Sequence, residues 1–223
     1  MMNIEFLIEE IRKMLQDMPK RESALEEINR SRDPFKVLIA AILSHRTKDE
    51  NTIKAFQQLF STYKDVKEIA EGDENKIKEL IRPAGFYRVK ARRIKEISKI
   101  IMDQYNGKVP DDLEKLLSLP SVGRKTANCV LVYGFGKEAI PVDTHVYRVM
   151  NRIGFVNTKT PEETEFELMK KVDRKYWMDL NLLFVKFGQR ICKPIMPKCN
   201  MCRLISYCKW YQEFGKKIYE KSF

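Results

Sequence analysis

Apolar side chains recur along most of this chain at the spacing of an α-helix. The pattern is clearest in three sets of positions: Ile4, Leu7, Ile8, Ile11 and Leu15; Val37, Leu38, Ala41 and Ile42; and Ile94, Ile97, Ile100 and Ile101. Spacings of three and four residues place such side chains on one face of a helix, and runs that alternate at the period of a strand are almost absent. The pattern predicts an all-α protein with about ten helices joined by short loops.

Proline and acidic residues mark where several of these helices begin. Asp33-Pro34, Pro110-Asp111-Asp112 and Pro161-Glu162-Glu163 each place proline or a carboxylate in a first turn, which the free N–H groups there favour. The sequence contains no internal repeat and no low-complexity linker. We therefore expect two closely packed domains with boundaries near Ile28 and Lys137.

The composition adds an excess of positive charge. Of 223 residues, 42 are Lys or Arg and 31 are Asp or Glu, which gives a formal net charge of +11. A Lys/Glu-rich surface would explain the number of charges but not their sign, so nucleic acid is the favoured partner. Glutamates near the amino terminus and the lack of a long apolar run predict an intracellular protein without a signal peptide or a membrane span.

Four of the five cysteines lie close together, at Cys192, Cys199, Cys202 and Cys208. Disulfides are disfavoured in a reducing compartment, which leaves a zinc site or an iron–sulfur cluster. Structural zinc usually takes two Cys-x-x-Cys or Cys/His pairs, but only one pair here has that spacing, and neither His45 nor His145 is near it in the sequence. Four thiolates in one compact loop favour the cluster over zinc.

The segment LPSVGRKTA, Leu119 to Ala127, contains a break between two helices at Pro120, with the second helix expected from about Val122. Gly123 permits a positive φ or a close approach of another backbone, and the helix that follows begins with free N–H groups. Such amides bind anions, and a phosphate is the obvious anion for a basic protein. A plain corner between two helices explains the short pattern equally well.

Lys125 and Asp143 are the candidates for chemistry. Lys125 lies in the first turn of the helix after Gly123, where the helix amino terminus and Arg124 both disfavour the ammonium form; a neutral amine is a nucleophile. Asp143 suits the N-cap of the helix THVYRVMNRI, and the length of the intervening chain allows it to return to the level of Lys125. The alternatives are a surface lysine and a carboxylate that only caps its helix.

Several segments resemble one known family. LPSVGRKTA resembles the helix-hairpin-helix of base-excision DNA glycosylases, and VDTHVYRV, Val142 to Val149, resembles the segment that follows it in the endonuclease III family. The cysteine spacing is similar to that of the family's 4Fe-4S loop. With DPFKVLIAAILSHRTKDE, the resemblance extends over most of the chain. It implies a six-helix barrel domain over 28–137 and a helical iron–sulfur domain built from 1–27 and 138–223. The implied ligands of the 4Fe-4S cluster are Cys192, Cys199, Cys202 and Cys208.

The resemblance also implies an activity, that of a bifunctional DNA glycosylase and AP lyase acting on oxidised pyrimidines. In this family the lysine, here Lys125, attacks C1′ of the damaged nucleoside, and the aspartate, here Asp143, assists base loss and stabilises the cationic sugar. The resulting Schiff base permits β-elimination of the 3′ phosphate. The implied partner is double-stranded DNA with damaged bases or abasic sites, and the protein would be a monomer in the cytoplasm or nucleoid of a prokaryote.

A DNA-binding surface is implied as well. Phe86, in GFYRVKARR, would fill the gap that a flipped base leaves, although a core aromatic is the alternative. Arg46 stands where the family commonly has glutamine and would reach the base opposite the lesion. Ser121 stands where the hairpin usually has glycine. The remaining implied contacts to DNA are Val122, Gly123 and Arg124 of the hairpin and Lys193, Lys198 and Arg203 of the cysteine loop.

Two other functions remain open. Mismatch glycosylases, which act on adenine or on the pyrimidine of a G:T or G:U pair, have the same fold, but they generally lack a lysine at the position of Lys125. The adenine branch also carries an extra carboxy-terminal domain for which this chain has no room. A non-catalytic helix-hairpin-helix module would bind DNA only, and the presence of both Lys125 and Asp143 would then be coincidence.

Overall fold

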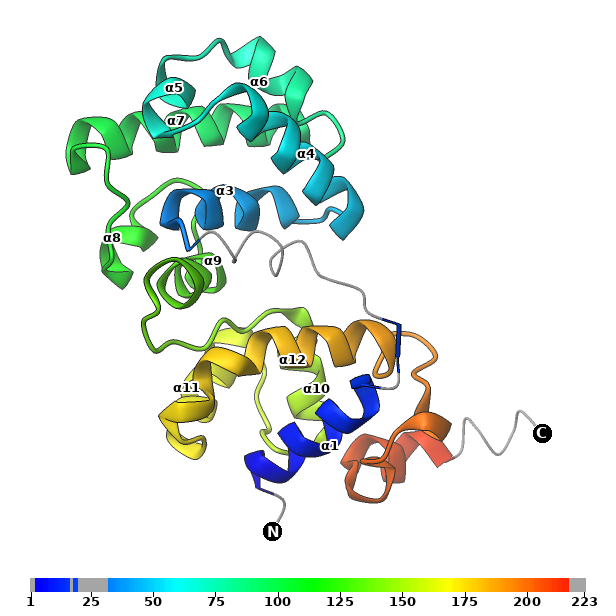
Figure 1. Cartoon of the computed structure of the whole chain (residues 1–223). Helices are drawn as coiled ribbons and strands as arrows, with labels where there is room; N and C mark the ends of the chain where they lie inside the picture. The colour runs from blue at the N-terminus through cyan, green and yellow to red at the C-terminus, as the bar shows by residue number, and fades with distance from the viewer. Residues whose placement is uncertain (1–2, 17, 20–31, 217–223) are drawn as a thin grey trace. The chain divides into compact units, whose positions relative to one another are not determined.

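The computed structural model describes residues 3–16, 18–19 and 32–216 (Figure 1). Within these residues the regular structure is helical throughout and contains no strand, which confirms the all-α prediction. The chain divides into two compact units, one of Met1–Arg21 with Ile140–Phe223 and one of Glu22–Ala139. The predicted boundary near Ile28 lies outside the described residues, and the assignment of a barrel domain and an iron–sulfur domain stays a prediction.

The unit Glu22–Ala139 is built around one buried helix, α3. Asp33 caps α3 by accepting the N–H groups of Phe35 and Lys36, and Pro34 occupies its first position, as predicted. Every residue from Val37 to Leu43 is at most 2% exposed, because this helix is apolar on all sides. The helices of this unit are α3 (Pro34–Ser44), α4 (Asp49–Thr62), α5 (Val66–Glu71), α6 (Glu74–Leu80), α7 (Tyr87–Tyr105), α8 (Leu113–Leu117), α9 (Arg124–Cys129) and the π-helical η1 (Val130–Gly134).

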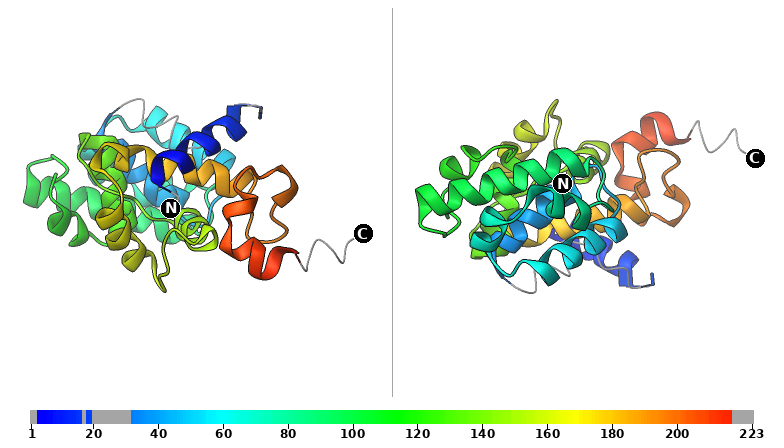
Figure 2. Two further views of the ribbon diagram at one scale, coloured as in Figure 1. Left: turned by 90° about the horizontal axis from the view of Figure 1, so that it is seen from below. Right: turned by 90° about the horizontal axis from the view of Figure 1, so that it is seen from above.

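The long helix α7 forms a second support of this unit, with α5 and α6 packed along it and α3 against it (Figures 1 and 2). The predicted apolar stripe of α7 is buried at Ile94, Ile97 and Ile101. The same stripe begins with a lysine, Lys90, which is only 7% exposed. A buried cation at the start of an apolar face needs hydrogen-bond partners, and it has them in the segment that follows α3.

The predicted hairpin consists of α8 and α9, with differences in detail. Asp112 caps α8 by accepting the N–H of Lys115, so Pro110 and Asp111 precede the helix instead of lying in its first turn. The second helix starts at Arg124, later than the expected Val122, and its N-cap Gly123 has φ −93° and ψ 174°. Gly123 does not adopt the positive φ that glycine permits: the backbone there is extended, and no protein atom lies within 4 Å of where a Cβ would stand. The left-handed residue of the hairpin is Ser121, at φ 63°.

The other described unit consists of α1 (Ile4–Gln16), α10 (Thr144–Ile153), α11 (Pro161–Lys171), α12 (Trp177–Arg190) and the short turns η2 (Arg174–Tyr176), η3 (Cys199–Met201), η4 (Ile205–Tyr207) and η5 (Tyr211–Gly215). Its centre is α12, which packs against α1 and α10. The predicted positions Ile4, Leu7, Ile8 and Ile11 are buried in this core, and Leu15 packs at its edge. None of the helices that the structure describes has both the length and the apolar character of a membrane span.

Candidate functional site

Lys125 is the second residue of α9 and is half-buried. The side chain of the next residue, Thr126, lies 3.1 Å from His45 Nε2, which joins the start of α9 to the residue that ends α3. Within the described residues no hydrogen bond or ion pair engages the Lys125 ammonium group. The backbone around this lysine is therefore fixed while its amine stays available.

His45 is neutral at physiological pH. Its pKa is lowered to about 4, chiefly because the ring is partly buried and additionally because Lys125 and Lys90 are positively charged. A neutral imidazole has one N–H donor and one acceptor nitrogen, so it pairs with the Thr126 hydroxyl without adding charge. The His45 ring near Lys125 is thus polar but uncharged, and it does not compete with Lys125 for an anion.

Three predicted DNA contacts from separate segments line one cavity of about 470 Å³: Arg46, Phe86 and Ser121. We call it the Arg46 cavity; its other lining residues are Ile42, His45, Val89, Lys90 and Arg93. Phe86 is 62% exposed, so the alternative of a core aromatic is wrong. The Arg46 guanidinium carbon lies 5.8 Å from the centre of the Phe86 ring, within range of a cation–π interaction.

The same three residues share an unusual backbone conformation. Arg46 has φ 51°, Phe86 has φ 58° and Ser121 has φ 63°. For residues with a Cβ, the left-handed region costs about 1–3 kcal/mol each and persists only where the surroundings impose it. Three such residues around one cavity indicate a surface shaped for binding, with an aromatic face, a guanidinium group and further basic side chains suited to nucleobases and phosphates.

Asp143 lies in the other unit, at the start of α10. Its Oδ1 accepts the N–H groups of His145 and Val146, both at 2.9 Å, which confirms the predicted N-cap. The cap uses only Oδ1, and Oδ2 stays outside it. The carboxylate is half-buried and is held in one orientation by its own helix.

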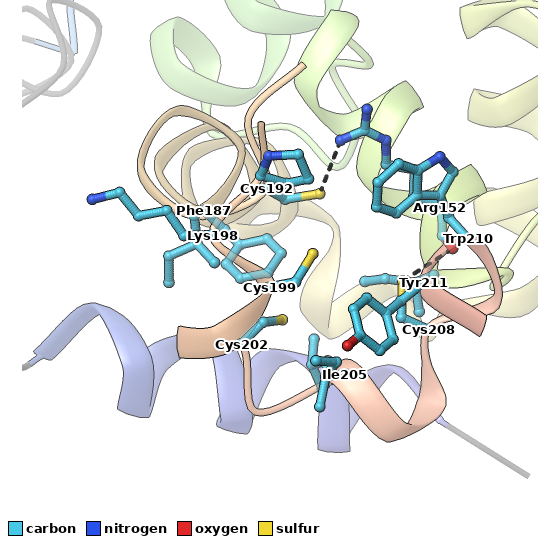
Figure 3. A pocket seen from close by; sticks show the side chains of 14 residues that line it. Arg152, Phe187, Cys192, Lys198, Cys199, Cys202, Ile205, Cys208, Trp210 and Tyr211 are labelled. Carbon is cyan, nitrogen blue, oxygen red and sulfur yellow. Dashed lines mark hydrogen bonds between the residues drawn. The ribbon is translucent and has the colours of Figure 1, made fainter. Parts of the chain in front are cut away.

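The four clustered cysteines line a single cavity at the carboxyl end of α12 (Figure 3). None of the four is in a disulfide, and the rest of the wall is mainly apolar, with Phe187, Leu204 and Trp210 among its residues. Arg152 from α10 reaches this cavity, with one guanidinium nitrogen 3.8 Å from Cys192 Sγ. Within the described residues, no three or more His, Cys, Asp or Glu side chains are grouped so as to hold a metal ion.

Burial affects the protonation of two of these thiols. It raises the pKa of Cys202 to about 12 and also raises the pKa of Cys208. Thiols in this environment stay protonated at neutral pH unless a bound cation takes the place of the proton. Cys129 is apart from this group, fully buried in the core of the other unit.

The cations of the cysteine loop are not equivalent. Lys193 and Lys198 are exposed. Arg203, for which a DNA contact stays a prediction, donates its Nε–H to Glu10 Oε2 of α1 at 2.6 Å. The hydrogen bond from Arg203 is also the main reason that the pKa of Glu10 is lowered. Arg203 therefore anchors the loop to α1, with part of its side chain still exposed.

The structural roles of three residues were not predicted from the sequence: Lys90, Thr47 and His45. A signal for Lys90 was present, because Lys90 continues the spacing of Ile94, Ile97 and Ile101 on the apolar face of α7. Its acceptors, however, lie more than forty positions earlier in the chain, at Leu43, His45 and Thr47. No local pattern identifies them.

Comparison with known proteins agrees with this geometry. The model of the HhH-GPD superfamily, base excision DNA repair proteins, matches residues 39–174. The chain is 52% identical to endonuclease III of Thermotoga maritima over 184 residues, 82% of this chain and 86% of that protein. It is 37% identical to endonuclease III of Bacillus subtilis over 215 residues, 96% and 95% of the two chains.

Two solved structures give the same result in three dimensions. A trapped endonuclease III–DNA covalent intermediate with an estranged adenine has a TM-score of 0.82 at 34% identity, covering 94% of this chain and 96% of that one. A thermostable thymine-DNA glycosylase has a TM-score of 0.81 at 28% identity, with the same coverage. The fold is thus that of a base-excision DNA glycosylase. The chain belongs to the endonuclease III family of the HhH-GPD superfamily, as its motifs predicted, and it is a DNA glycosylase and AP lyase.

The left-handed serine of the hairpin allows a test of backbone strain. We expect Ser121→Gly to raise the free energy of unfolding by roughly 0.5–1 kcal/mol, because glycine adopts φ 63° without the steric cost that serine bears. Ser118→Gly is the matched control, since Ser118 has φ −71° and the same substitution there should lower that free energy by a similar amount. Urea denaturation measures both. Changes of the same sign at the two positions would contradict the assignment of strain to Ser121.

Proposed function

We propose that this protein removes oxidised pyrimidines from double-stranded DNA and cleaves the strand by β-elimination through a Schiff base on Lys125. The observation that carries the proposal is an available lysine in the first turn of α9, directly after the hairpin, in a chain of the endonuclease III family. Mismatch glycosylases of this fold generally lack that lysine. A non-catalytic module that only binds DNA would need neither Lys125 nor Asp143.

In the proposed reaction the Lys125 amine attacks C1′ of the damaged nucleoside. The C1′–N bond breaks, its electron pair leaves with the base, and the base takes up a proton. The attached nitrogen then gives up one proton, the C1′–O4′ bond breaks with O4′ taking up a proton, and the resulting iminium, which keeps one N–H, acidifies the C2′ proton. Removal of that proton expels the 3′ phosphate and breaks the strand, so one amine serves both activities.

Asp143 supplies the negative charge that this reaction needs. As C1′ loses the base, positive charge develops on the sugar, and a fixed carboxylate stabilises it without reorganising. The N–H groups of His145 and Val146 hold Oδ1, which keeps the carboxylate oriented. Oδ2 is the oxygen proposed to face the sugar.

The proposed DNA surface has two parts in the unit Glu22–Ala139. The hairpin residues Ser121, Val122, Gly123 and Arg124 would bind phosphate, and the open space at Gly123 supports a close approach of the DNA backbone there. Phe86 would enter the duplex as a wedge, as its 62% exposure supports, and Arg46 beside it would contact the base opposite the lesion.

We also propose that Cys192, Cys199, Cys202 and Cys208 hold a 4Fe-4S cluster. The donor set suits such a group, because four cysteines outside any disulfide line one cavity with an otherwise mainly apolar wall. A bound cluster would replace the thiol protons and fix the loop that presents Lys193 and Lys198 to the DNA backbone. The same inference assigns the barrel domain to 28–137 and the iron–sulfur domain to 1–27 and 138–223, in a monomer working inside a prokaryotic cell.

Replacement of Lys125 tests the nucleophile. Lys125→Gln is expected to abolish strand cleavage at an abasic site and covalent trapping by borohydride, while affinity for the same duplex stays within about threefold because the phosphate contacts remain. Lys99→Gln, an exposed lysine of α7, is the control and should cleave and trap normally. A Lys125→Gln protein that cleaves as well as the wild type would overturn the assignment.

Asp143→Asn separates the cap from the chemistry. Asparagine caps a helix as well as aspartate does, so the melting temperature should stay close to that of the wild type. Base removal in single turnovers should fall by at least about a hundredfold, because the charge is lost. Asp112→Asn makes the same change at the N-cap of α8 and should leave base removal intact. If Asp143→Asn removes bases at the wild-type rate, the residue only caps α10.

Metal analysis tests the cluster directly. Protein purified without oxygen should contain about four irons per chain, as expected for a cubane bound by four thiolates. Cys199→Ser should lose iron and solubility, whereas Cys129→Ser, a buried cysteine outside the group, should keep its iron. One zinc and no iron in the wild type would replace the cluster proposal with a zinc site.

A further inference from the structure

Lys90 is a buried, hydrogen-bonded lysine to which the proposed function gives no role. We propose that Lys90 is a positioning residue that sets lesion recognition by holding the segment after α3 against the start of α7, so that Arg46 and Phe86 face the same cavity. This inference rests on the proposed function, in which Arg46 and Phe86 contact the DNA around the lesion.

The hydrogen bonds of Lys90 are saturated. Its Nζ donates to Leu43 O at 2.7 Å, to His45 O at 2.7 Å and to Thr47 Oγ1 at 2.8 Å. An ammonium group has three N–H donors, and all three are used. The side chain is 7% exposed. Lys90 is therefore neither an available nucleophile nor a phosphate ligand, although it lines the Arg46 cavity.

These bonds determine the path of the segment that carries Arg46. Two of the acceptors are backbone carbonyls at the carboxyl end of α3, which have no partners further along the helix and favour a cation. His45 and Thr47 on either side of Arg46 both bond to Lys90, and Arg46 between them adopts φ 51°. The left-handed turn at Arg46 is thus fixed from both sides.

Thr47 extends the connection to Phe86. Its Oγ1 accepts the Gly85 N–H at 3.1 Å as well as the Lys90 bond, and its hydroxyl proton goes to His45 O at 3.2 Å. A Cβ on Gly85 would stand 2.7 Å from Arg46 O, so only glycine allows the two segments to approach this closely. Phe86 follows directly, at φ 58°. The Lys90 ammonium and the Thr47 hydroxyl therefore connect the segments that carry the two left-handed residues, Arg46 and Phe86.

The protonation of Lys90 gives this arrangement a pH dependence. Burial lowers the pKa of Lys90 to about 8. The other charged or titratable groups lining the cavity are His45, already neutral because its pKa is lowered to about 4, and Arg46 and Arg93, which stay cationic throughout. Among the residues that line this cavity, Lys90 is thus the one whose charge changes above pH 8, where its ammonium group loses a proton.

Fold stability and recognition should respond to this titration in opposite directions. The unfolded chain keeps the Lys90 proton up to its ordinary pKa near 10.5, whereas the folded chain releases it near 8. Between these values the unfolded state binds more protons, so the contribution of Lys90 to the free energy of unfolding rises with pH. Lesion recognition should fall over the same range, because the ammonium that holds Arg46 and Phe86 is lost. A purely structural role for Lys90 would not separate the two.

The test is a binding panel on intact, metal-loaded protein. Duplexes carry a tetrahydrofuran abasic analogue, which cannot be cleaved, opposite each of the four bases, and an undamaged duplex serves as the reference. Fluorescence anisotropy gives the dissociation constants from pH 6.5 to 9.5 for the wild type, Lys90→Met, Thr47→Val and Thr47→Ser. Lys99→Met, an exposed lysine on the same helix, is the matched control.

We expect Lys90→Met to lose about tenfold of its preference for the analogue over undamaged DNA and to distinguish the four opposing bases less well, with undamaged duplex bound within about twofold of the wild type. Thr47→Val should lose part of the preference, Thr47→Ser should retain it because it keeps the hydroxyl, and Lys99→Met should be unchanged. The wild type should lose preference above pH 8, and Lys90→Met should show no such step.

A preference in Lys90→Met equal to that of the wild type would overturn the proposal, as would equal weakening towards all duplexes. If Lys90→Met does not fold, the contrast between Thr47→Val and Thr47→Ser decides, and identical behaviour of those two variants would equally overturn it. Borohydride trapping of the wild type on natural abasic DNA is run in parallel. Failure to trap would refute the Lys125 chemistry, while the binding panel still reports on Lys90.

Discussion

The burial of α3 on all sides is the constraint on which the unit Glu22–Ala139 depends. A helix without a polar face needs cover in every direction, and α4, α7, α9 and η1 provide it. Its two ends then need polar partners inside the protein. Asp33 satisfies the amino end locally, whereas the carboxyl end is satisfied by a lysine that arrives from α7. The contact of Lys90 with the carboxyl end of α3 also positions residues of the Arg46 cavity, because the segment held by Lys90 carries His45, Arg46 and Thr47.

The strained backbone around the Arg46 cavity is held in place by the groups that surround it. Three left-handed residues cost about 1–3 kcal/mol each, and their surroundings impose each of them. Contacts of Thr47 and Lys90 between distant segments impose the turns at Arg46 and Phe86, whereas the local corner between α8 and α9 imposes the turn at Ser121. A surface held in this way is rigid in the free protein, and a rigid surface loses less entropy when it binds a ligand.

The sequence predicted those features that depend on local chemistry. The apolar stripes of α1, α3 and α7, the caps at Asp33 and Asp143, the hairpin and the cysteine loop all follow from spacing or from a preference of one residue type. The left-handed residue of the hairpin is Ser121, which no pattern indicates, because glycine is the usual signal for that conformation and serine gives none. The pairing of Arg203 with Glu10 and the bonds of Lys90 join positions far apart in the chain, and periodicity contains no information about them.

The cysteine loop illustrates how a surface with little core of its own can still be held in place. Between Cys192 and Cys208 the large apolar side chains Ile195, Met196, Met201 and Tyr207 are exposed, and Leu204 is the aliphatic side chain that is fully buried. Its protein contacts come from outside: Arg152 donates to the carbonyls of Lys193 and Pro194 and stacks on Trp210, and Glu10 binds Arg203. These contacts fix several points along the loop, while the four cysteine side chains line one cavity. The path of the loop between these points, and with it the positions of the exposed Lys193 and Lys198, therefore depends on what the four cysteines bind.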